Sequence, residues 1–438
     1  MTVEKSEQSG LKSFPIVYWV SIFFEFMERG AYYGVMSILS VYLVTSVQDG
    51  GLGFDKSSVG VIKSTIQPII YALPILSGAL ADRFGYKKAL LTAFSFLGLG
   101  YMLVSQSHGY AVVMASLVVM AIGAGTFKPV ISGTIAKTTG EHNSTLGFGI
   151  FYWTINLGAF LFPLILVPAM KGLGWQYVFI ASGIATGILI IPCLAFYKEP
   201  PRPENTKSIA QILGDAVMVL KDVKFVSLIL IYSGFWILYF QMFDTVLWYL
   251  KDHMDMTPVN MFINSILTSI GINMQFKFDA EHVTVINAGT IITLQLIISN
   301  ITKKTKPLPT MIIGILMGTI GMAILSISTY AWVFVGGIIL FSVGEMTAHP
   351  KFLSYVGLIA PKDKVATYMG YSFLYGVVGS GIGGILGAKS YVHFIDNLHN
   401  PSALWLMFSC IGVATIVGLI LYNTFVATKT KTKENGES

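Results

Sequence analysis

The sequence predicts an all-α membrane protein with twelve membrane-spanning helices. Hydrophobic residues make up 54% of its 438 residues and charged residues only 11%, whereas soluble domains carry about 25% charged residues. The apolar residues are gathered in twelve stretches, each close to or above the roughly 20 residues that a helix needs to cross a bilayer. Lysine and arginine are concentrated in alternate connections between these stretches, as they are in multi-pass proteins.

The spans fall into two groups of six, separated by a polar break. The first group is predicted at about 14–43, 58–81, 89–106, 110–136, 147–170 and 175–197. The second group is predicted at about 224–250, 283–302, 308–328, 331–359, 366–392 and 402–427. The break begins with a proline-rich stretch and continues with apolar residues at helical spacing from Ile209 to Leu220. That spacing predicts an amphipathic helix along the inner membrane surface.

This division predicts four regions. They are an N-terminal six-helix bundle at 1–197, a cytoplasmic linker at 198–223, a C-terminal six-helix bundle at 224–428 and a cytoplasmic tail at 429–438. Two related halves are also indicated by segments 123–129 and 344–350, which share glycine, threonine and proline in the same frame. These segments lie in spans four and ten, the equivalent positions of two parallel repeats.

The distribution of basic residues predicts the orientation. Nineteen of the 28 lysines and arginines fall in segments on one side, and four fall inside spans. The five assigned to outer segments are Lys56, Lys63, Lys171, Lys251 and Lys277. Since cytoplasmic connections carry the excess of basic residues, both termini are predicted to be cytoplasmic, in a cell membrane. The largest outer segment, 251–283, suggests no function.

Nothing in the sequence indicates an enzyme. It contains no nucleotide-binding loop, metal-ligand spacing or nucleophile elbow, so we expect no metal and no cofactor. The two cysteines, Cys193 and Cys410, lie in apolar stretches and are expected to be small buried residues. The net charge of +6 is explained by the basic residues in the segments predicted to be cytoplasmic, and it does not indicate binding to nucleic acid.

The first span carries a group of polar side chains that a bilayer would not tolerate without a reason. At 100° per residue, Glu25, Glu28, Arg29, Tyr32 and Tyr33 fall on one face of the helix. A single charge at the centre of a span costs roughly 2.5–3.5 kcal/mol on insertion scales, so such groups are usually retained for function. The two glutamates could also do no more than neutralise nearby cations.

The opposite face of the first span carries Gly30 and Gly34, four residues apart. Small residues at this spacing let two helix backbones approach closely. The first span is therefore predicted to pack on one side and to hold polar groups on the other.

The connection after the second span contains Gly78, Asp82, Arg83 and Gly85, followed by two lysines. This arrangement resembles the loop signature of major facilitators, although an ordinary basic inner loop is the alternative. The resemblance implies the major facilitator fold, in which two six-helix bundles surround a central cavity. The glycines would permit a tight turn, and the charged groups would contact neighbouring helix ends.

Further motifs resemble the proton-coupled oligopeptide transporter family. The first span matches the family's E-x-x-E-R-F-x-Y-Y-G pattern except that Gly30 replaces phenylalanine, and its F-Y-x-x-I-N-x-G motif is intact at 151–158. Other positions that match the family are Tyr71, Lys128 before Pro129, Asn287 after Ile286, and Glu345 between Gly344 and Pro350.

The resemblance implies a symporter that imports di- and tripeptides with protons. Arg29 and Lys128 would bind the substrate carboxylate, Glu345 its ammonium group, and Asn156 and Asn287 its amides. Tyr32, Tyr33 and Tyr71 would complete the substrate site, and Glu25, Glu28, Arg29 and Lys128 would couple binding to protonation. The implied partners are a small peptide, protons and the lipid bilayer, with the protein functional as a monomer and no nucleic acid involved.

The chain also departs from the family pattern. Met36 stands where members have an arginine, Phe240 where they have an acid, and Ser372 where bacterial members have a tryptophan. The arginine and the acid pair across the family's outer gate, so Asp244 and Gln241 become the gate candidates here. Two other interpretations remain open: a relative that carries another solute (an amino acid, nitrate, a drug or a siderophore-like compound), and a non-transporting sensor.

Overall fold

The computed structural model describes residues 10–140, 143–200, 208–362 and 364–427. In this part of the chain all regular secondary structure is helical, apart from one isolated bridge between Asp255 and Tyr330. The predicted all-α fold is therefore confirmed. The predicted tail at 429–438 and the proline-rich start of the linker at 201–207 lie outside the described residues.

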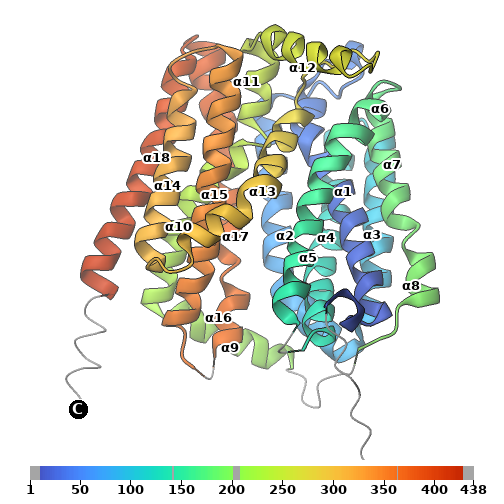
Figure 1. Cartoon of the computed structure of the whole chain (residues 1–438), viewed down its shortest axis with the longest axis vertical. Helices are drawn as coiled ribbons and strands as arrows, with labels where there is room; N and C mark the ends of the chain where they lie inside the picture. Colours follow the sequence, from blue (N-terminus) through green and yellow to red (C-terminus); the bar gives the residue numbers. More distant parts are fainter. Residues whose placement is uncertain (1–9, 141–142, 201–207, 363, 428–438) are drawn as a thin grey trace, which may run out of the picture. The chain divides into compact units, whose positions relative to one another are not determined.

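The chain packs into two compact units (Figure 1). Unit 1 comprises Met1–Val35 and Ala72–Ile212, and unit 2 comprises Met36–Tyr71 and Leu213–Ser438. Three helices run from one unit into the other: α1 (Ile16–Val44), α2 (Lys56–Phe84) and α9 (Ile209–Lys221). The six-plus-six division expected from span order remains a prediction.

Unit 1 contains the helices of spans three to six. They are α3 (Tyr86–Gln106), α4 (Tyr110–Thr138), α5 (Ser144–Leu161), α6 (Val167–Lys171), α7 (Trp175–Gly187) and α8 (Ile190–Phe196), with a 3₁₀ turn η1 (Gly10–Ser13) and a π turn η3 (Phe162–Leu166).

Unit 2 contains the remaining helices. They are α10 (Val223–Gln241), α11 (Thr245–His253), α12 (Thr257–Ser269), α13 (Glu281–Thr302), α14 (Pro307–Ile324), α15 (Ala331–Ile359), α16 (Val365–Tyr371), α17 (Leu374–Tyr391) and α18 (Pro401–Tyr422), with η2 (Val47–Asp49), η4 (Val392–Asn397) and η5 (Asn423–Ala427).

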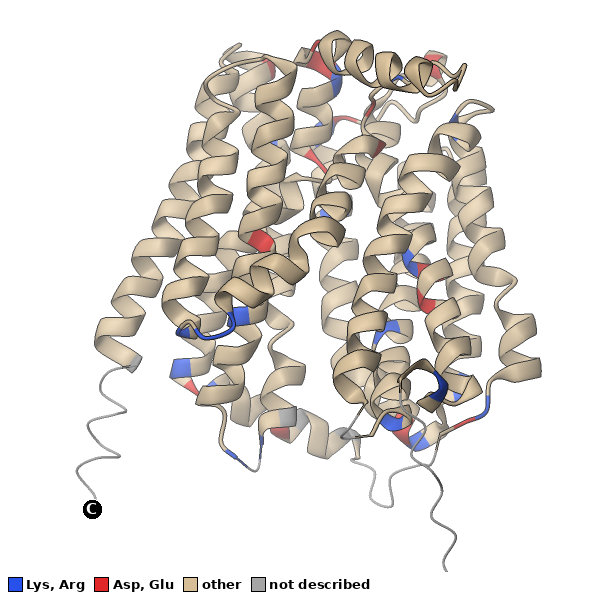
Figure 2. Ribbon diagram, in the orientation of Figure 1, with Lys and Arg blue, Asp and Glu red and all other residues tan. Residues whose placement is uncertain are grey.

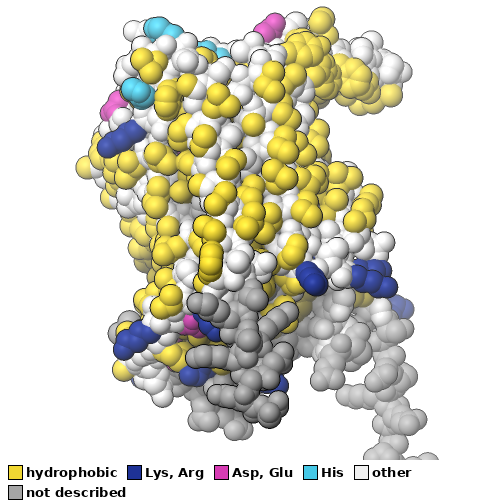
Figure 3. All heavy atoms as spheres, turned by 90° about the vertical axis from the view of Figure 1, so that its left-hand side faces the viewer, with side chains coloured by type: hydrophobic (Ala, Val, Ile, Leu, Met, Phe, Trp, Pro, Cys, Tyr) yellow, Lys and Arg dark blue, Asp and Glu magenta, His cyan; other side chains and the backbone are white. Residues whose placement is uncertain are grey.

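The predicted spans coincide with these helices to within a few residues. Eleven helical stretches among the described residues are long and apolar enough to cross a membrane. The helix α1, with 29 residues, is also long enough to cross a membrane, but it contains three charged residues, Glu25, Glu28 and Arg29. The amphipathic helix predicted in the linker is α9. Hydrophobic side chains cover most of the face shown in Figure 3, and Lys and Arg gather at the lower helix ends within each unit in Figure 2.

Four of the predicted spans are divided in the described part of the chain. Span five continues from α5 through η3 into α6, span six breaks between α7 and α8, span seven breaks between α10 and α11, and span eleven breaks between α16 and α17. In a bilayer no water is present to bond a freed backbone group, so such a break needs partners from the protein. The break in span seven has them, as shown below.

Polar residues fix the ends of several helices. Asp55 caps α2, because its carboxylate accepts hydrogen bonds from the Ser58 hydroxyl at 2.6 Å and from the Ser58 backbone N–H at 2.8 Å. These two bonds lower the pKa of Asp55 below its usual value.

Two expectations about individual residues are wrong. Lys63 was assigned to an outer segment, but it lies inside α2 with only 1% of its surface exposed. Cys410 was expected to be buried, whereas it is exposed on α18, and only Cys193 is buried. An exposed cysteine on a spanning helix is compatible with lipid contact because its side chain is a small hydrophobe.

Candidate functional site

A buried charged cluster forms around Arg29 on α1. The guanidinium donates two parallel hydrogen bonds to the Glu28 carboxylate, from Nε at 2.6 Å and from Nη2 at 2.8 Å. Glu25, one turn earlier, lies 3.8 Å from Arg29 Nε. None of the three residues is more than 6% exposed. The charges that are costly in a membrane are thus held together in unit 1, as the sequence predicts.

Three side chains surround this cluster. Lys128 on α4 is close enough to interact electrostatically with Glu25, Glu28 and Arg29. The Arg29 guanidinium also lies over the Tyr32 ring, 4.8 Å from its centre, and Tyr32 packs edge-to-face on Tyr33. The cation therefore has carboxylates on one side and an aromatic ring on another, an arrangement that stabilises a desolvated guanidinium.

Glycines place α1 directly against α5 and η3. A side chain at Gly158 would collide with the backbone of α1 at Phe26 and Gly30, and a side chain at Gly30 would collide with the ring of Phe162. The close packing predicted for Gly30 is confirmed, and Gly34 is in ordinary contact with Val167 and Phe162. Phe162 also explains the departure at Gly30, because its ring fills the space beside α1 where a phenylalanine at position 30 would lie.

Asn156 lies on α5 in unit 1, and its side-chain hydrogen bond is within its own helix and not with the cluster around Arg29. Its side-chain amide donates to the carbonyl of Tyr152 on its own helix at 2.9 Å, and Asn156 is 7% exposed. This bond leaves the amide oxygen available as an acceptor.

Unit 2 joins two other predicted residues. The Asn287 side-chain amide on α13 donates to the Glu345 carboxylate on α15 at 2.9 Å and lies 2.9 Å from the Ser342 hydroxyl. His349, one turn after Glu345, lies 3.3 Å from the Tyr232 hydroxyl. A carboxylate and an amide from separate spans therefore meet inside the bundle of unit 2, which is where a polar substrate group could be bound.

Tyr71 lies in an aromatic cluster of unit 2. Its ring is 5.7 Å from Phe240, 6.2 Å from Trp236 and 6.2 Å from Tyr375. A side chain at Gly376 would collide with Tyr71, so that glycine makes room for the ring. Phe240, where relatives have an acid, is thus a packing residue, and Tyr375 supplies an aromatic ring three residues after Ser372.

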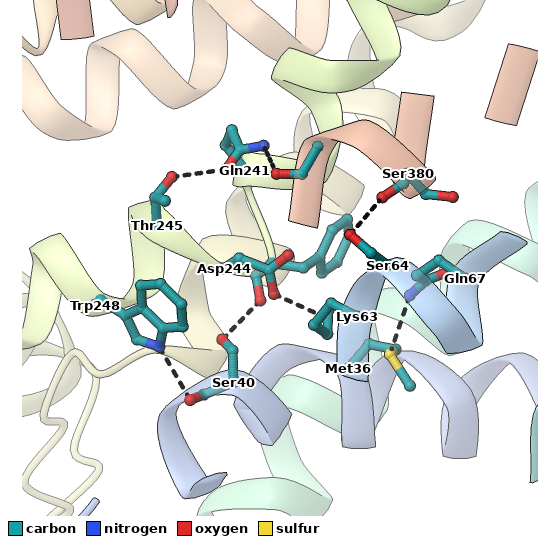
Figure 4. Close-up of polar contacts among 12 residues, drawn as sticks. Met36, Ser40, Lys63, Ser64, Gln67, Gln241, Asp244, Thr245, Trp248 and Ser380 are labelled. Atoms are coloured by element: carbon teal, nitrogen blue, oxygen red, sulfur yellow. Dashed lines mark hydrogen bonds and ion pairs between the residues drawn. The ribbon is translucent and has the colours of Figure 1, made fainter. Parts of the chain in front are cut away.

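A second buried ion pair joins α2 to the break in span seven (Figure 4). Lys63 Nζ lies 3.0 Å from Asp244 Oδ1, and the two side chains are 1% and 5% exposed. Neither atom has a further hydrogen-bond partner in the described part of the chain. Asp244 is the gate candidate from the sequence, and Lys63 is its buried partner, which sequence reasoning did not identify.

The polar groups around this pair bond the broken backbone of span seven (Figure 4). The Ser40 hydroxyl donates to the carbonyl of Phe243 at 2.7 Å, and the Trp248 indole donates to the carbonyl of Ser40 at 2.9 Å. Gln241, the other gate candidate, donates to Gly383 on α17 at 3.1 Å. The break is therefore bonded to α1 and α17 and needs no water.

The ion pair lies near Met36 and Phe240, the two departures noted in the sequence. Met36 contacts Gln67, with 3.4 Å between the amide nitrogen and the sulfur, and Lys63 lies one turn before Gln67. Asp244 lies one turn after Phe240. A cation and an acid are thus present near these two positions, on α2 and at the break in span seven, and both lie in unit 2.

The inner loop of unit 1 contains the charged contacts that its motif predicts. Asp82 accepts a hydrogen bond from the Tyr86 hydroxyl at 2.9 Å and pairs with Lys137 at the end of α4 at 3.2 Å. Gly85 separates α2 from α3 with a φ of 107°, a conformation that other residues rarely adopt. Gly78 packs against Pro129 of α4, and Arg83 lies over Phe84.

A second residue was also missed. Tyr101 on α3 is fully buried, its hydroxyl has no hydrogen-bond partner among the described residues, and it interacts electrostatically with Glu28 and Arg29. A single tyrosine in an apolar span is not distinguished by the sequence as a functional candidate.

A pocket of about 620 Å³ at the start of α2 and the end of α11 is lined by none of the residues predicted to bind substrate.

Comparison with known proteins gives a consistent result. A model of the Major Facilitator Superfamily matches residues 18–388. An uncharacterized transporter, YclF of Bacillus subtilis, is 32% identical over 43% of this chain and 38% of its own length. A di-/tripeptide transporter of Lactococcus lactis is 28% identical over 49% of this chain and 44% of its own. The chain thus spans less than half the length of these two relatives.

Two similarities extend over nearly the whole chain. The peptide transporter YePEPT of Yersinia enterocolitica is 24% identical over 91% of this chain and 92% of its own. The crystal structure of a mutant peptide transporter in complex with sulfate has a TM-score of 0.80 at 20% identity, covering 96% of each chain. At this identity the structural likeness supports the fold.

Proposed function

Because the chain belongs to the Major Facilitator Superfamily, we propose that it is a proton-coupled symporter that imports di- and tripeptides by alternating access. The similarity to transporters named for peptides supports this substrate class, as do the motifs of the oligopeptide transporter family. The observation that carries the proposal is the buried cluster in which Arg29 is bound by two carboxylates on a spanning helix.

The substrate carboxylate binds Arg29 and Lys128 in this proposal. A guanidinium can pair with a carboxylate through two hydrogen bonds, and an ammonium adds a point charge. Tyr32 and Tyr33 line this end of the substrate in unit 1, and Asn156 bonds a peptide amide through its free oxygen. The substrate ammonium is bound by Glu345, with Asn287 and Tyr71 beside it in unit 2.

Protonation follows from competition for Arg29. A substrate carboxylate that binds Arg29 displaces Glu28 or Glu25, and a buried carboxylate that loses its cation takes up a proton. Glu25, Glu28 and Glu345 carry three negative charges, and Arg29 and Lys128 carry two positive ones. A zwitterionic peptide adds no net charge, so one proton makes the loaded site neutral. A neutral site crosses the low-dielectric interior at a smaller cost than a charged one.

The gate is formed by Asp244 together with Lys63 and Gln241. These residues connect α2, the break in span seven and α17, and the ion pair must separate before α2 can move away from the break. At the other end, Gly78, Asp82, Arg83 and Gly85 form the loop that changes conformation, since the contact between Asp82 and Lys137 links α2 to α4.

Four further statements belong to the same proposal. The protein lies in the cytoplasmic membrane with both termini in the cytoplasm, it acts as a monomer, its driving force is the proton gradient, and it uses no cofactor. The six-helix bundles at 1–197 and 224–428, joined by the linker at 198–223, are the bodies that rock about the substrate.

Transport by purified protein in liposomes tests the proposal. We expect a labelled dipeptide to accumulate when the interior is alkaline, and unlabelled di- and tripeptides to compete. Glu25→Gln and Glu28→Gln should differ from each other: the variant that removes the coupling group loses proton-driven uptake but retains exchange of labelled for unlabelled peptide. Asp49→Asn, at an exposed position in η2, is the control.

Three results would contradict the proposal. Full proton-driven uptake by both variants would show that neither glutamate takes part in coupling. Uptake that amino acids or other solutes block, and peptides do not, would favour the relative that carries another solute. A protein that binds peptide in a thermal-shift assay and gives no flux would be the sensor.

A further inference from the structure

The outer segment between spans seven and eight contains a helix with a partly exposed apolar side. In α12, Val259, Phe262, Ile263, Ile266 and Leu267 are spaced three and four residues apart and share one face. Val259 is buried, while Phe262 is 53% and Ile266 is 45% exposed. The apolar face therefore begins against the protein and continues onto the outside.

The residues after α12 extend this surface. The chain turns at Gly271, whose φ is 79°, and returns beside the helix. Ile270, Ile272 and Met274 are 64%, 43% and 59% exposed. A water-facing surface of this kind has no evident benefit, because each apolar group taken out of water contributes favourably in proportion to its area.

Hydrogen bonds hold the returning segment against α12. Asn264 bonds both backbone groups of Phe276, accepting from its N–H at 2.6 Å and donating to its carbonyl at 2.9 Å. Asn260 accepts from the N–H of Phe278 at 2.7 Å. The polar side chains thus form hydrogen bonds within the segment, and the apolar side chains remain on its outside as a preformed surface.

A neighbouring span shows the depth at which this surface lies. Phe262 packs edge-to-face on Trp332, with 5.3 Å between ring centres, and Trp332 is the second residue of the membrane-spanning helix α15. Asp255, just before α12, bridges to Tyr330, the residue before α15. Trp332 and Tyr330 are themselves exposed. Tryptophan and tyrosine are enriched where a span leaves the hydrocarbon core, so α12 lies at the membrane–water boundary.

The charge and orientation of the segment fit the same place. Residues 256–276 contain no Asp, Glu, Lys or Arg, and Lys277 is the first charge after them. In Figure 1, α12 runs across the upper ends of the unit 2 spans instead of along them. In Figure 3 the segment overhangs at the upper right, with hydrophobic side chains along its lower edge.

We propose that α12 and the segment that follows it, residues 257–276, lie in the headgroup region of the adjacent leaflet and insert Phe262, Ile266 and Ile270 among the lipid chains. The occupant of the apolar surface is lipid, since the surface is continuous, through Phe262, with the exposed Trp332 of the membrane-spanning helix α15. Binding depends on apolar area alone and not on anionic lipid, because the segment offers no basic residue. This contact ties the connection between spans seven and eight to the bilayer.

Spin labels in single-copy nanodiscs test the proposal independently of transport. The label is attached to Ile266→Cys on the apolar face or to Thr268→Cys, an exposed position on the polar face of the same helix, with Cys193 and Cys410 replaced by serine. Collision of each label with dissolved oxygen, which concentrates in lipid, is compared with collision with a water-soluble nickel complex. The oxygen-to-nickel ratio should be several-fold higher at Ile266 than at Thr268, with neutral and with anionic lipid alike.

Other outcomes would overturn the proposal. Equal, nickel-dominated collision at both positions would mean that the helix projects into water. Shielding of Ile266 from both reagents would mean that protein covers the surface. If lipid contact at Ile266 is lost in discs that hold two copies, the surface is an interface between copies of this chain.

Discussion

At the level of single residues, the pair Lys63–Asp244 illustrates what a bilayer-spanning protein requires of a buried charge. Two opposite charges 3.0 Å apart in a nearly dry site stabilise each other, but each also lost its water to get there. The net contribution of the pair to folding can therefore be small. The cost of removing one partner is large, because the remaining charge stays buried and unpaired.

This asymmetry predicts the behaviour of neutral variants. Lys63→Gln and Asp244→Asn alone should each destabilise the protein by roughly 3–5 kcal/mol, whereas the double variant should recover most of the loss. The readout is the unfolding temperature of the purified protein in detergent, measured for all three variants under one condition.

A matched control exists at the start of the same helix. Lys56 also pairs with acids, Asp396 at 2.9 Å and Asp252 at 3.6 Å, but these side chains are 18–42% exposed. Lys56→Gln should cost no more than about 1 kcal/mol, as exposed pairs do. Equal losses for Lys56→Gln and Lys63→Gln would show that burial of the second pair does not determine its energy.

The ion pair of Lys63 could not be predicted from the sequence. A lysine near the start of a span is expected to extend its ammonium toward water, and the partner that prevents this lies about 180 residues later in the chain. Asp244 could be recognised as an unusual acid in a span, but its partner could not. Glu25, Glu28 and Arg29 were recognisable because they are neighbours on one helix.

At the level of elements, the crossing of α1 and α5 depends on the absence of side chains at two positions. Gly158 faces backbone atoms of α1, which cannot move aside as a flexible side chain could. This contact gives a physical reason for the glycine that ends the F-Y-x-x-I-N-x-G motif.

Two glycines of α5 allow a direct comparison. Gly158→Ala should lower the unfolding temperature, by an amount equivalent to about 1–3 kcal/mol, because overpacking forces the helices apart. Gly149→Ala, where a methyl group meets no other atom, should be neutral or stabilising by up to about 1 kcal/mol, since alanine is the better helix former. A larger loss for Gly149→Ala would contradict the assigned crossing.

Elements differ in how well the sequence predicts them. The spans were predicted closely because a bilayer demands long apolar stretches, and α15 has the predicted bounds. The breaks were not, since the break in span seven at residues 242–244 is held by a hydrogen bond from Ser40, in a different span, to the carbonyl of Phe243. The pattern of α12 was present in the sequence, but its neutral, moderately apolar residues did not distinguish an interfacial helix from an ordinary connection.

At the level of the whole molecule, the charge distribution makes a prediction about orientation. Thr268 in α12 and Ser208 before α9 are both exposed and lie on opposite sides of the membrane in the proposed topology. In intact cells a membrane-impermeant maleimide should label Thr268→Cys, and it should label Ser208→Cys only after permeabilisation. The protein with its native cysteines serves as the control, and the reverse pattern would invert the topology.

The two compact units divide the chain differently from the order of the spans. The first 20 residues of α1, up to Val35, belong to unit 1 with the Arg29 cluster, and its last residues belong to unit 2 with the Lys63–Asp244 pair. One helix therefore carries residues of both units, and so does α2. Together with α9, which also has residues in both units, these helices connect the units along the chain, which a division at the central linker would not reveal.

The pairing of Lys63 with Asp244 has an electrical consequence. A membrane potential does work on net charge, about 2.3 kcal/mol per elementary charge for each 100 mV crossed. Moved as a unit, the ammonium and carboxylate carry no net charge, and the potential does no net work on them. Only their separation along the field would produce a displacement current. The ion pair at the break in span seven is therefore electrically silent for as long as it stays closed.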